Sequence, residues 1–230
     1  ATKVYKRFDR IFTVSEEARE KLVKMVPSIN DKTKVFTNMI SPELIIEEAK
    51  MGVGFQQDNF TGIRIVTVGR LAFEKGQDLA IKAMVKLIKD GINVKWYCIG
   101  EGKGRKEYEE LIDRYQLQDK FILLGENSNP YRFIKECDIY VQPSRHEGYC
   151  ITLAEARALD RPIVTTSFTG AKEQVKHNET GLVVSIHEDQ IYYAVKGLIY
   201  NPKQREKFSR NLSNEMFESI GRIGRIYNIV

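Results

Sequence analysis

The 230-residue chain is 42% hydrophobic and 29% charged, with a formal net charge of +5 and a pI near 9.0. This composition excludes an intrinsically disordered chain and allows a sizeable core. The basic excess is moderate and suits phosphate-bearing ligands or an anionic membrane surface. Because no dense Arg/Lys block is interleaved with aromatic residues, nucleic acid is not an expected partner.

Cysteine usage and hydropathy indicate the compartment. Cys98, Cys137 and Cys150 form an odd set without C-x-x-C spacing, which argues against a disulfide framework or a zinc site and favours a reducing cytosol. No apolar run is long enough to cross a bilayer, and no signal sequence opens the chain. We expect a cytoplasmic protein whose full-length form is open to membrane association. A chain without an initiator Met is expected to be a fragment.

Residues 1–45 are expected to form an entry segment. Ser15, followed by two glutamates, predicts a helix N-cap with acids in the first turn, and Pro27 limits the helix at its other end. The expected elements, in order, are a strand at 10–14, a helix at 16–25, a strand at 34–37, a turn at 38–42 and a polar loop at 50–61 that contains Gly52, Gly54, Gln56, Gln57 and Asn59.

From residue 63 onward, apolar runs alternate with amphipathic segments. Strands are expected at 63–68, 94–99, 121–124, 138–141, 162–165 and 182–184. Helices are expected at 77–90, 106–115, 131–137, 152–159, 173–176, 187–200 and 202–220. This alternation predicts an α/β fold with a doubly wound parallel sheet. We expect residues 46–220 to form one Rossmann-like domain and residues 221–230 a tail.

Charged residues cluster where strands of this sheet end, and ligands bind outside the carboxyl ends of such strands. Arg70 and Lys75 follow the strand at 63–68, in a loop with a glycine at each end. Glu147 follows a later strand, and Glu155 lies in the opening turn of the next helix. A guanidinium, an ammonium and unpaired amides at a helix N-terminus together bind a diphosphate, and carboxylates accept from hydroxyls. The pattern favours a phosphorylated sugar over an acid/base pair.

Plainer interpretations of the same residues stay open at this point. Thr152 and Glu155 have the T-x-x-E spacing of a capping box, in which Glu155 would serve backbone donors alone. Arg70 and Lys75, each taken alone, are most often surface charges. Their joint position at strand ends favours the ligand interpretation.

Several short motifs run in a fixed order over roughly residues 10–215. They are Val68-Gly69-Arg70-Leu71 with Glu74-Lys75-Gly76, Ile99-Gly100-Glu101-Gly102, Leu123-Leu124-Gly125, Pro143-Ser144-x-x-Glu147-Gly148, Ala154-Glu155-Ala156, Arg161-Pro162-Ile163-Val164, Gly170 with Glu173, and Gly181-Leu182-Val183. The ordered set resembles the C-terminal, donor-binding domain of retaining GT-B glycosyltransferases with the E-x7-E motif, the group 1 glycosyltransferase family. This large bacterial class makes polysaccharides, glycolipids and glycosylated proteins.

The resemblance implies a role for each matching residue. Arg70 and Lys75 would hold the diphosphate and stabilise the leaving nucleoside diphosphate, and Glu147 would hold the transferred sugar. Glu155 would hold the ribose hydroxyls. The other donor-binding residues implied by the resemblance are Gly69, Asn127, Tyr131, Gly148, Tyr149, Cys150, Ile151 and Thr152. Among these, Asn127 and Tyr131 fall where the family contacts the base.

The implied reaction is retaining transfer of a hexose from a nucleotide-diphospho-sugar, most simply a UDP-sugar, to a glycan, lipid or protein acceptor. The charge of the leaving diphosphate is stabilised electrostatically. No metal and no cofactor other than the donor substrate are implied. Two departures from the family pattern stand out: Cys150 replaces a common glycine and is expected to narrow the sugar pocket, and Asp160 replaces a helix-ending glycine with no expected harm.

The resemblance also limits what this chain is expected to do alone. In GT-B enzymes a first, N-terminal domain holds most of the acceptor site, and residues 1–45 would be the link from its end. The chain alone is therefore expected to bind the donor weakly and not to turn over. Two alternatives remain: a nucleotide-sugar epimerase, which would need an acid/base pair in the cleft, and a non-catalytic sugar-nucleotide-binding domain.

Overall fold

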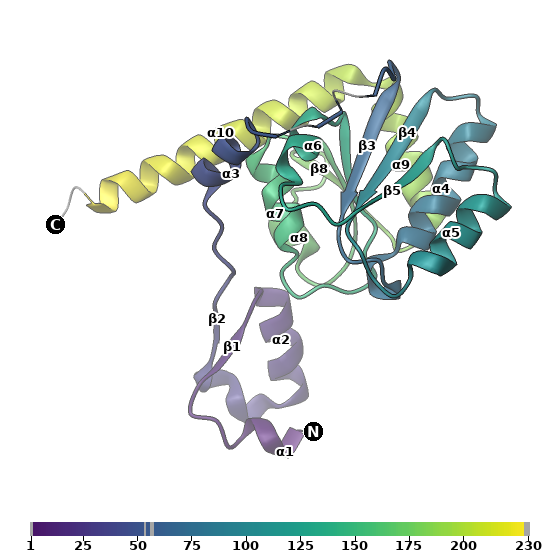
Figure 1. The fold of residues 1–230 in the computed structure, drawn as a ribbon. Coiled ribbons are helices and arrows are strands. Elements are labelled where there is room, and N and C mark those ends of the chain that lie inside the picture. Colours follow the sequence, from purple (N-terminus) through teal and green to yellow (C-terminus); the bar gives the residue numbers. More distant parts are fainter. Residues whose placement is uncertain (1, 53, 56–57, 228–230) are drawn as a thin grey trace.

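A six-stranded parallel sheet forms the centre of the molecule (Figure 1). The computed structural model describes the backbone of residues 2–52, 54–55 and 58–227, and side chains from residue 4 to residue 215 within those ranges. The strands are β3 Ile63–Val68, β4 Val94–Ile99, β5 Phe121–Gly125, β6 Ile139–Gln142, β7 Ile163–Thr166 and β8 Gly181–Val184. Their order across the sheet is β5-β4-β3-β6-β7-β8. The predicted doubly wound α/β fold is confirmed.

The order of the strands reverses in the middle of the sheet. Strands β3, β4 and β5 follow one another toward one edge, and β6, β7 and β8 follow one another toward the other edge. At the reversal, β3 pairs with β6 through Ile65↔Ile139 and Val66↔Tyr140. The chain leaves β3 and β6 toward opposite sides of the sheet, which opens a crevice at their carboxyl ends. The loops after β3 and β6 therefore face one another.

Helices cover both faces of the sheet, with α4, α5 and α9 on one side and α3, α6, α7 and α8 on the other (Figure 1). Their bounds are α3 Pro42–Glu48, α4 Gln77–Lys89, α5 Arg105–Arg114, α6 Tyr131–Glu136, α7 Ile151–Ala158, α8 Ala171–Gln174, α9 Glu188–Tyr200 and α10 Pro202–Tyr227. Helical spacing puts Leu79, Ala83 and Leu87 of α4 on one buried face. Helix α10 joins the two layers, because Phe208 packs in one apolar cluster and Leu212 in the other.

Residues 2–37, which we call the N-terminal segment, form a small unit beyond the carboxyl edge of the sheet (Figure 1). Its elements are α1 Thr2–Tyr5, β1 Ile11–Thr13, α2 Glu16–Met25, the 3-10 helix η1 Pro27–Lys32 and β2 Thr33–Val35. Strands β1 and β2 pair in parallel. The predicted start of α2 is confirmed, since Ser15 Oγ accepts a hydrogen bond from the Ala18 amide at 3.2 Å.

The N-terminal segment is attached to the sheet domain through the first turn of α2. Two backbone amides of that turn, on Glu16 and Glu17, donate to the Glu173 carboxylate of α8 at 3.0 and 2.8 Å. In return the Gly170 amide donates to Glu17 Oε2 at 2.7 Å. Lys21 Nζ donates to Thr169 Oγ1 at 2.8 Å. These contacts hold α2 against the loop that follows β7.

Helix α3 was not expected from the sequence. The expected turn at 38–42 is followed by a helix rather than by a loop, and Ser41 Oγ caps it by accepting from the Leu44 amide at 3.4 Å. Pro42 occupies the first helical position, where its missing amide costs nothing. The expected polar loop begins at about the right place, but Gln56 and Gln57 lie outside the described residues. Helix α10 continues beyond residue 220 to Tyr227.

Candidate active site

Lys75 and Glu147 meet in the crevice between β3 and β6. Lys75 ends the 3-10 turn η2 Phe73–Lys75, which follows β3, and Glu147 lies in the loop after β6. The Lys75 Nζ donates to both carboxylate oxygens of Glu147, at 2.8 and 2.7 Å. The side chain of Glu147 is 6% exposed and that of Lys75 is 21% exposed. Two side chains that are 72 residues apart in sequence thus form an ion pair inside the crevice.

The loop carrying Lys75 rests directly on the loop carrying Glu147. Gly76 has φ of 72°, and a Cβ on this residue would lie 2.0 Å from the Pro143 carbonyl oxygen. Only glycine fits this conformation and this approach. Next to it, the Glu74 carbonyl accepts from the backbone amides of Arg145 and His146 at 2.8 and 3.2 Å. The spacing between the two loops is therefore fixed by backbone contacts.

Arg145 adds a side-chain link between the same loops. Its guanidinium donates to both Asp78 carboxylate oxygens at 2.7 Å, the paired geometry that suits arginine. The same group donates to the Phe73 carbonyl at 2.8 Å and stacks over the Phe73 ring at 4.0 Å. Asp78 lies in the first turn of α4, so Arg145 fastens the β6–α7 loop to the start of α4. The sequence motifs give no indication of this contact.

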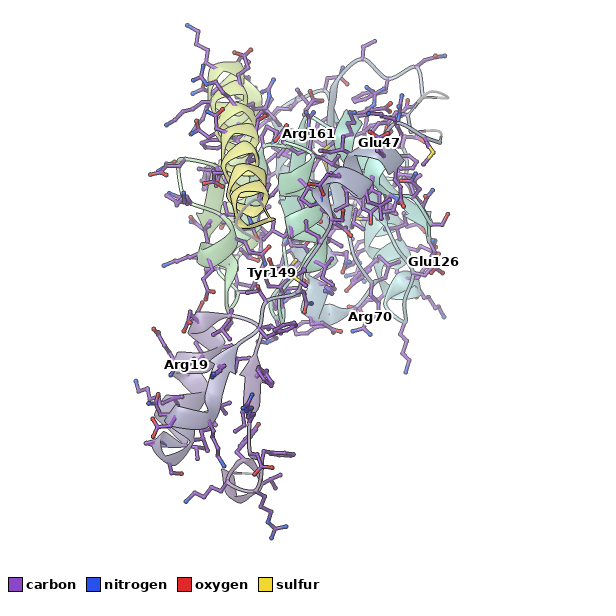
Figure 2. The ribbon with its side chains drawn as sticks, turned by 90° about the vertical axis from the view of Figure 1, so that its left-hand side faces the viewer. Arg19, Glu47, Arg70, Glu126, Tyr149 and Arg161 are labelled. Carbon is purple, nitrogen blue, oxygen red and sulfur yellow. The ribbon has the colours of Figure 1, made fainter. Side chains whose placement is uncertain are left out.

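Arg70 lies at the mouth of the crevice rather than in the Lys75–Glu147 pair. Its side chain is 66% exposed and donates to Glu74 Oε1 at 2.6 Å. Figure 2 shows Arg70 and Tyr149 at the end of the domain that faces the N-terminal segment, and Arg161 and Glu47 at the opposite end. The backbone of Arg70 is held by Gln77, whose Nε2 donates to the Arg70 carbonyl at 2.9 Å.

A cavity of about 370 Å³ runs along the carboxyl ends of β3, β4 and β5. It is lined by Val68, Gly69, Arg70, Ile99, Gly100, Glu101, Glu126 and Asn127. Three of the predicted donor-binding residues, Gly69, Arg70 and Asn127, are thus brought together here. The backbones that follow β3 and β4 approach closely here: a Cβ on Gly100 would lie 2.3 Å from the Gly69 carbonyl oxygen. The cavity adjoins the ion pair through the 69–75 loop.

Glu155 faces a different partner from Glu147. Tyr131, the first residue of α6, donates its hydroxyl to Glu155 Oε1 at 3.2 Å. Burial raises the pKa of Glu155 above its ordinary value. Burial, together with the nearby Glu155 charge, raises the pKa of Tyr131 to about 12, so the phenol stays a donor. The structure therefore places Tyr131 on the carboxylate expected to hold ribose.

The first turn of α7 carries amides without side-chain partners. Cys150 is its N-cap residue, and in the described part of the chain no side chain caps this helix. Thr152 Oγ1 donates instead to Gln142 Oε1 at 3.3 Å, and Glu155 is bound by Tyr131. The alternative of a Thr152–Glu155 capping box is therefore wrong. The amides of Ile151 and Thr152 have no preceding helical carbonyl, so this end of α7 can bind an anion.

The side chain of Cys150 points into the protein. Its φ of 57° is left-handed, its side chain is buried, and its Sγ lies 3.7 Å from Thr152 Oγ1. Burial raises the pKa of the thiol to about 12. The thiol packs in the apolar cluster that contains Leu153 and Phe168, and the narrowing of the sugar pocket by this residue stays a prediction. Cys150 can offer a ligand its backbone amide.

Three further residues singled out in the sequence, Gly148, Tyr149 and Asp160, lie just before or just after α7. The Tyr149 carbonyl accepts from Gln174 Nε2 of α8. The Tyr149 side chain lines a separate cavity of about 180 Å³ with residues of α7 and α10. Gly148 is exposed, and a Cβ there would lie 3.8 Å from Val14 of the N-terminal segment. Asp160, after α7, has φ of 55°, the conformation of the helix-ending glycine that it replaces.

The charged groups of the crevice are paired with one another or with uncharged donors. Among the residues that the structure describes, no three His, Cys, Asp or Glu side chains are grouped so as to hold a metal ion. Within the same ranges, no helix has both the length and the apolar character of a membrane span.

The chain is similar over most of its length to curated glycosyltransferases. It is 26% identical over 213 residues to an uncharacterized glycosyltransferase of Methanocaldococcus jannaschii, covering 92% of this chain and 52% of that protein. It is 30% identical over 207 residues to an N-acetylgalactosaminyltransferase of Campylobacter jejuni that acts on a diphospho-undecaprenol-linked acceptor, covering 89% of this chain and 54% of that enzyme. The chain thus spans about half the length of these relatives.

Solved structures share the fold. A crystal structure of Anabaena HepE in complex with UDP superposes with a TM-score of 0.81 at 18% identity, covering 100% of this chain and 66% of that chain. The lipopolysaccharide glycosyltransferase WaaG superposes with a TM-score of 0.75 at 16% identity, covering 88% of this chain and 57% of that chain. The architecture is therefore the Rossmann-like half of the GT-B fold.

A family model agrees with these similarities and with the geometry of the crevice. The model described as "Glycosyl transferases group 1" matches residues 55–214, which is most of the chain. The matched span contains β3 to β8 and both loops of the crevice. This chain belongs to the group 1 glycosyltransferase family.

Proposed function

We propose that this chain is the donor-binding half of a retaining glycosyltransferase, which transfers a hexose from a UDP-sugar to a glycan, lipid or protein acceptor. The observation that carries the proposal is the pairing of Lys75 with Glu147 beside the uncapped first turn of α7. A diphosphate has the charge that an ammonium and free helix amides bind. A neighbouring carboxylate accepts from the hydroxyls of the attached sugar.

Donor binding exchanges the partners of the charged groups. Lys75 turns from Glu147 to the diphosphate, and Arg70 turns from Glu74 to the same group. Glu147 is then available to the sugar hydroxyls. As the bond between the anomeric carbon and the phosphate oxygen breaks, negative charge grows on the leaving UDP. Lys75 and the amides of Ile151 and Thr152 stabilise that charge. The acceptor hydroxyl oxygen bonds to the anomeric carbon on the face that UDP leaves, and its proton passes to the departing phosphate oxygen.

The nucleoside extends from the diphosphate toward β4 and β5. Glu155, held by Tyr131, accepts from the ribose hydroxyls, and the cavity beside Gly69 and Asn127 receives the base. A UDP-sugar is the first choice of donor because crystal structures of the similar Anabaena HepE contain UDP and UDP-glucose. No cofactor or metal is required in this scheme, since Lys75, Arg70 and α7 supply the positive charge.

A second domain of the full-length protein completes the enzyme. The chain spans about half the length of its relatives, and its N-terminal segment lies beyond the carboxyl edge of the sheet (Figure 1). On that segment Phe12 and Phe36 form an edge-to-face pair while 59% and 61% exposed, which marks an interaction surface. We place the acceptor site in an N-terminal domain that packs there, on the cytoplasmic side. The moderate basic charge suits peripheral contact with an anionic membrane.

The test measures binding by the chain and transfer by the full-length protein. Thermal unfolding is followed with a panel of UDP-, GDP- and ADP-sugars, because a ligand that binds the native state raises Tm. Lys75→Met is expected to reduce transfer by the full-length protein by about 100-fold or more, as loss of a charge-stabilising donor does. Lys89→Met, which removes an exposed lysine of α4, is the matched control and keeps full transfer.

Three outcomes would contradict the proposal. Equal losses from Lys75→Met and Lys89→Met would show that the crevice is not the site. A wild-type chain that no nucleoside diphosphate stabilises would remove the donor-binding role. Binding of UDP without any transfer by the full-length protein would identify a sugar-nucleotide-binding domain instead.

A further inference from the structure

Gln142 is a fully buried amide in the wall of the crevice, at the last position of β6. Its Oε1 accepts from the Tyr140 hydroxyl at 2.8 Å and from Thr152 Oγ1 at 3.3 Å. Its Nε2 donates to Ser144 Oγ at 2.8 Å and to Glu147 Oε1 at 3.3 Å. An amide side chain has two donor and two acceptor positions, and Gln142 uses all of them.

Glu147 determines which way the amide of Gln142 points. An ionised carboxylate can only accept, so the NH2 group must face Glu147. The reverse orientation would place Oε1 against the carboxylate and leave the buried NH2 group against the hydroxyl oxygens of Tyr140 and Thr152. Ser144 reinforces the arrangement, because its hydroxyl donates to the same Glu147 oxygen at 2.6 Å. Two uncharged donors therefore hold Glu147 from inside the protein.

The backbone beneath this network is anchored to the neighbouring strand. Thr165 Oγ1 and Thr166 Oγ1 of β7 both donate to the Gln142 carbonyl, at 3.2 and 3.3 Å. Thr166 Oγ1 also donates to the Ser144 carbonyl. Both threonines are buried, so the end of β6 cannot shift without breaking bonds that water cannot replace. Gln142 acts from a fixed position.

We propose that Gln142, with Ser144, is a positioning residue that keeps Glu147 directed at the sugar after Lys75 has turned to the diphosphate. This inference rests on the proposed function. Once Lys75 leaves, Glu147 is a nearly buried carboxylate without its charged partner, an arrangement that is costly unless other donors remain. Gln142 and Ser144 are those donors.

The same amide also links the two halves of the donor site. Its Oε1 holds Thr152 in the first turn of α7, the turn expected to face the diphosphate. Its Nε2 holds Glu147, the residue expected to face the sugar. Gln142 therefore fixes the distance between the group that binds phosphate and the group that binds sugar. A residue of this kind affects catalysis without touching the substrate.

The first test compares two ligands in the full-length protein. Gln142→Met keeps the length of the side chain and removes all four hydrogen bonds. We expect the Kd for UDP to stay within about 2-fold and the Kd for the UDP-sugar selected by the panel to rise about 10-fold, the scale of one lost hydrogen-bonded contact. We expect kcat to fall more than KM rises. Ser144→Ala gives the same pattern with a smaller change.

Equal losses of affinity for UDP and for the UDP-sugar would overturn the inference, because they would show a general disturbance of the crevice. Unchanged affinity and kcat would also overturn it. Neither result affects the donor-binding proposal, which wild-type binding and Lys75→Met decide separately.

A second test needs no ligand. Thermal unfolding of Gln142→Met, Glu147→Gln and the double variant measures whether the two residues depend on one another. We expect the double variant to lose less Tm than the sum of the single losses, by about 2 °C or more, because residues in one network are not additive. Strict additivity would show that Gln142 does not hold Glu147 and would overturn the inference, whatever the protein binds.

Discussion

Helices α2 and α7 both begin near the carboxyl edge of the sheet, but among the described residues side chains bind the N-terminal amides of α2 and not those of α7. At α2, Ser15 Oγ caps the helix, and the Glu173 carboxylate accepts from the amides of Glu16 and Glu17. At α7, no side chain in the described part of the chain serves as a cap. Every helix start is a weakly positive site. The protein fills one of these two sites itself and leaves the other open.

The carboxylates near each helix follow the same division. Glu17 and Glu173 bond to backbone amides and tie the N-terminal segment to the loop after β7. Glu147 lies in the loop before α7, and Glu155 lies within α7 just beyond its first turn rather than in the opening turn as predicted. They bond to Lys75 and Tyr131 instead of to the α7 amides. An acidic residue near a helix start therefore stabilises the fold when its carboxylate accepts from the helix amides. When another side chain binds the carboxylate instead, the amides stay open to a ligand.

The largest expected effect comes from giving α7 the kind of partner that α2 has. Cys150→Asp would place a carboxylate on the inner side of the α7 N-terminus, where its negative charge opposes a diphosphate bound at the amides of Ile151 and Thr152. We expect a loss of about 2 kcal/mol of UDP binding, or roughly 30-fold in Kd, from the charge at a partly buried helix end. Calorimetric titration with UDP measures it.

Cys150→Asn is the matched control for that change. Asparagine has the same shape, tolerates the left-handed conformation and carries no charge. We expect it to keep the Kd for UDP within about 3-fold and to lower Tm less than aspartate does, because burying an uncharged amide costs less than burying a carboxylate. If the two variants weaken UDP equally, shape rather than charge governs this end of α7 and the comparison with α2 fails.

A smaller effect is expected from loosening the filled site. Glu173→Gln removes the negative charge that the α2 amides bind, and glutamine has one acceptor oxygen for two donors. We expect a loss of about 1 kcal/mol in the attachment of the N-terminal segment and no change in UDP binding. Limited proteolysis within residues 2–37 reports the first effect. Glu179→Gln, a neutralised exposed glutamate, serves as the control, and a parallel loss of UDP binding by Glu173→Gln would contradict the separation of the two sites.

The smallest effects are expected from pH, and they have opposite signs at the two helices. The Gly170 amide, followed by Lys21, lowers the pKa of Glu17, so its contribution to stability is present at neutral pH and is lost as pH falls through the folded-state pKa. Burial raises the pKa of Glu155, so wild-type stability rises as pH falls through that value. We expect Glu17→Gln to lower Tm at pH 7 and Glu155→Gln to raise it.

Both differences from wild type should shrink toward acid pH, where the wild-type carboxyls are protonated and resemble the amides. The shift for Glu155→Gln should disappear at the higher pH of the two, because its carboxyl is protonated first. Tm measured from about pH 3.5 to 7, a range that spans the ordinary glutamic acid pKa, checks both curves. Differences of the same sign would remove the electrostatic contrast between the helices.

The sheet could be predicted from the sequence because its strands are unambiguous. Strands β3 and β4 are apolar runs, rich in β-branched and aromatic residues, with glycine directly after their ends, and their bounds agree with prediction. Helix α3 was missed because seven residues are too few to show a periodic face. Its start signal, Ser41-Pro42-Glu43, was present in the sequence and was interpreted as a turn.

The convergence of Lys75 and Glu147 on one crevice could also be anticipated, since loops at the reversal point of such a sheet must converge, but their direct ion pair was not predicted. The contacts that hold the two loops and Glu147 in place could not be anticipated from the sequence. Arg145 in a loop is typical of a surface charge, and its bonds to Asp78 depend on how two loops meet in space. Gln142 depends on the register that sets Thr165 and Thr166 beside it. The inward direction of the Cys150 side chain depends on the left-handed φ of that residue.

The close contact of Gly76 with the Pro143 carbonyl limits how this part of the chain can vary. A methyl group at residue 76 would overlap that oxygen at 2.0 Å, and the two loops would have to separate to relieve the overlap. Because each loop carries one member of the ion pair, such a change would lengthen the distance between the Lys75 ammonium and the Glu147 carboxylate. Neither charge would change. The contact at this glycine thus fixes the separation of the two loops, and under the proposed function donors of different length would be accommodated toward β4 and β5 instead.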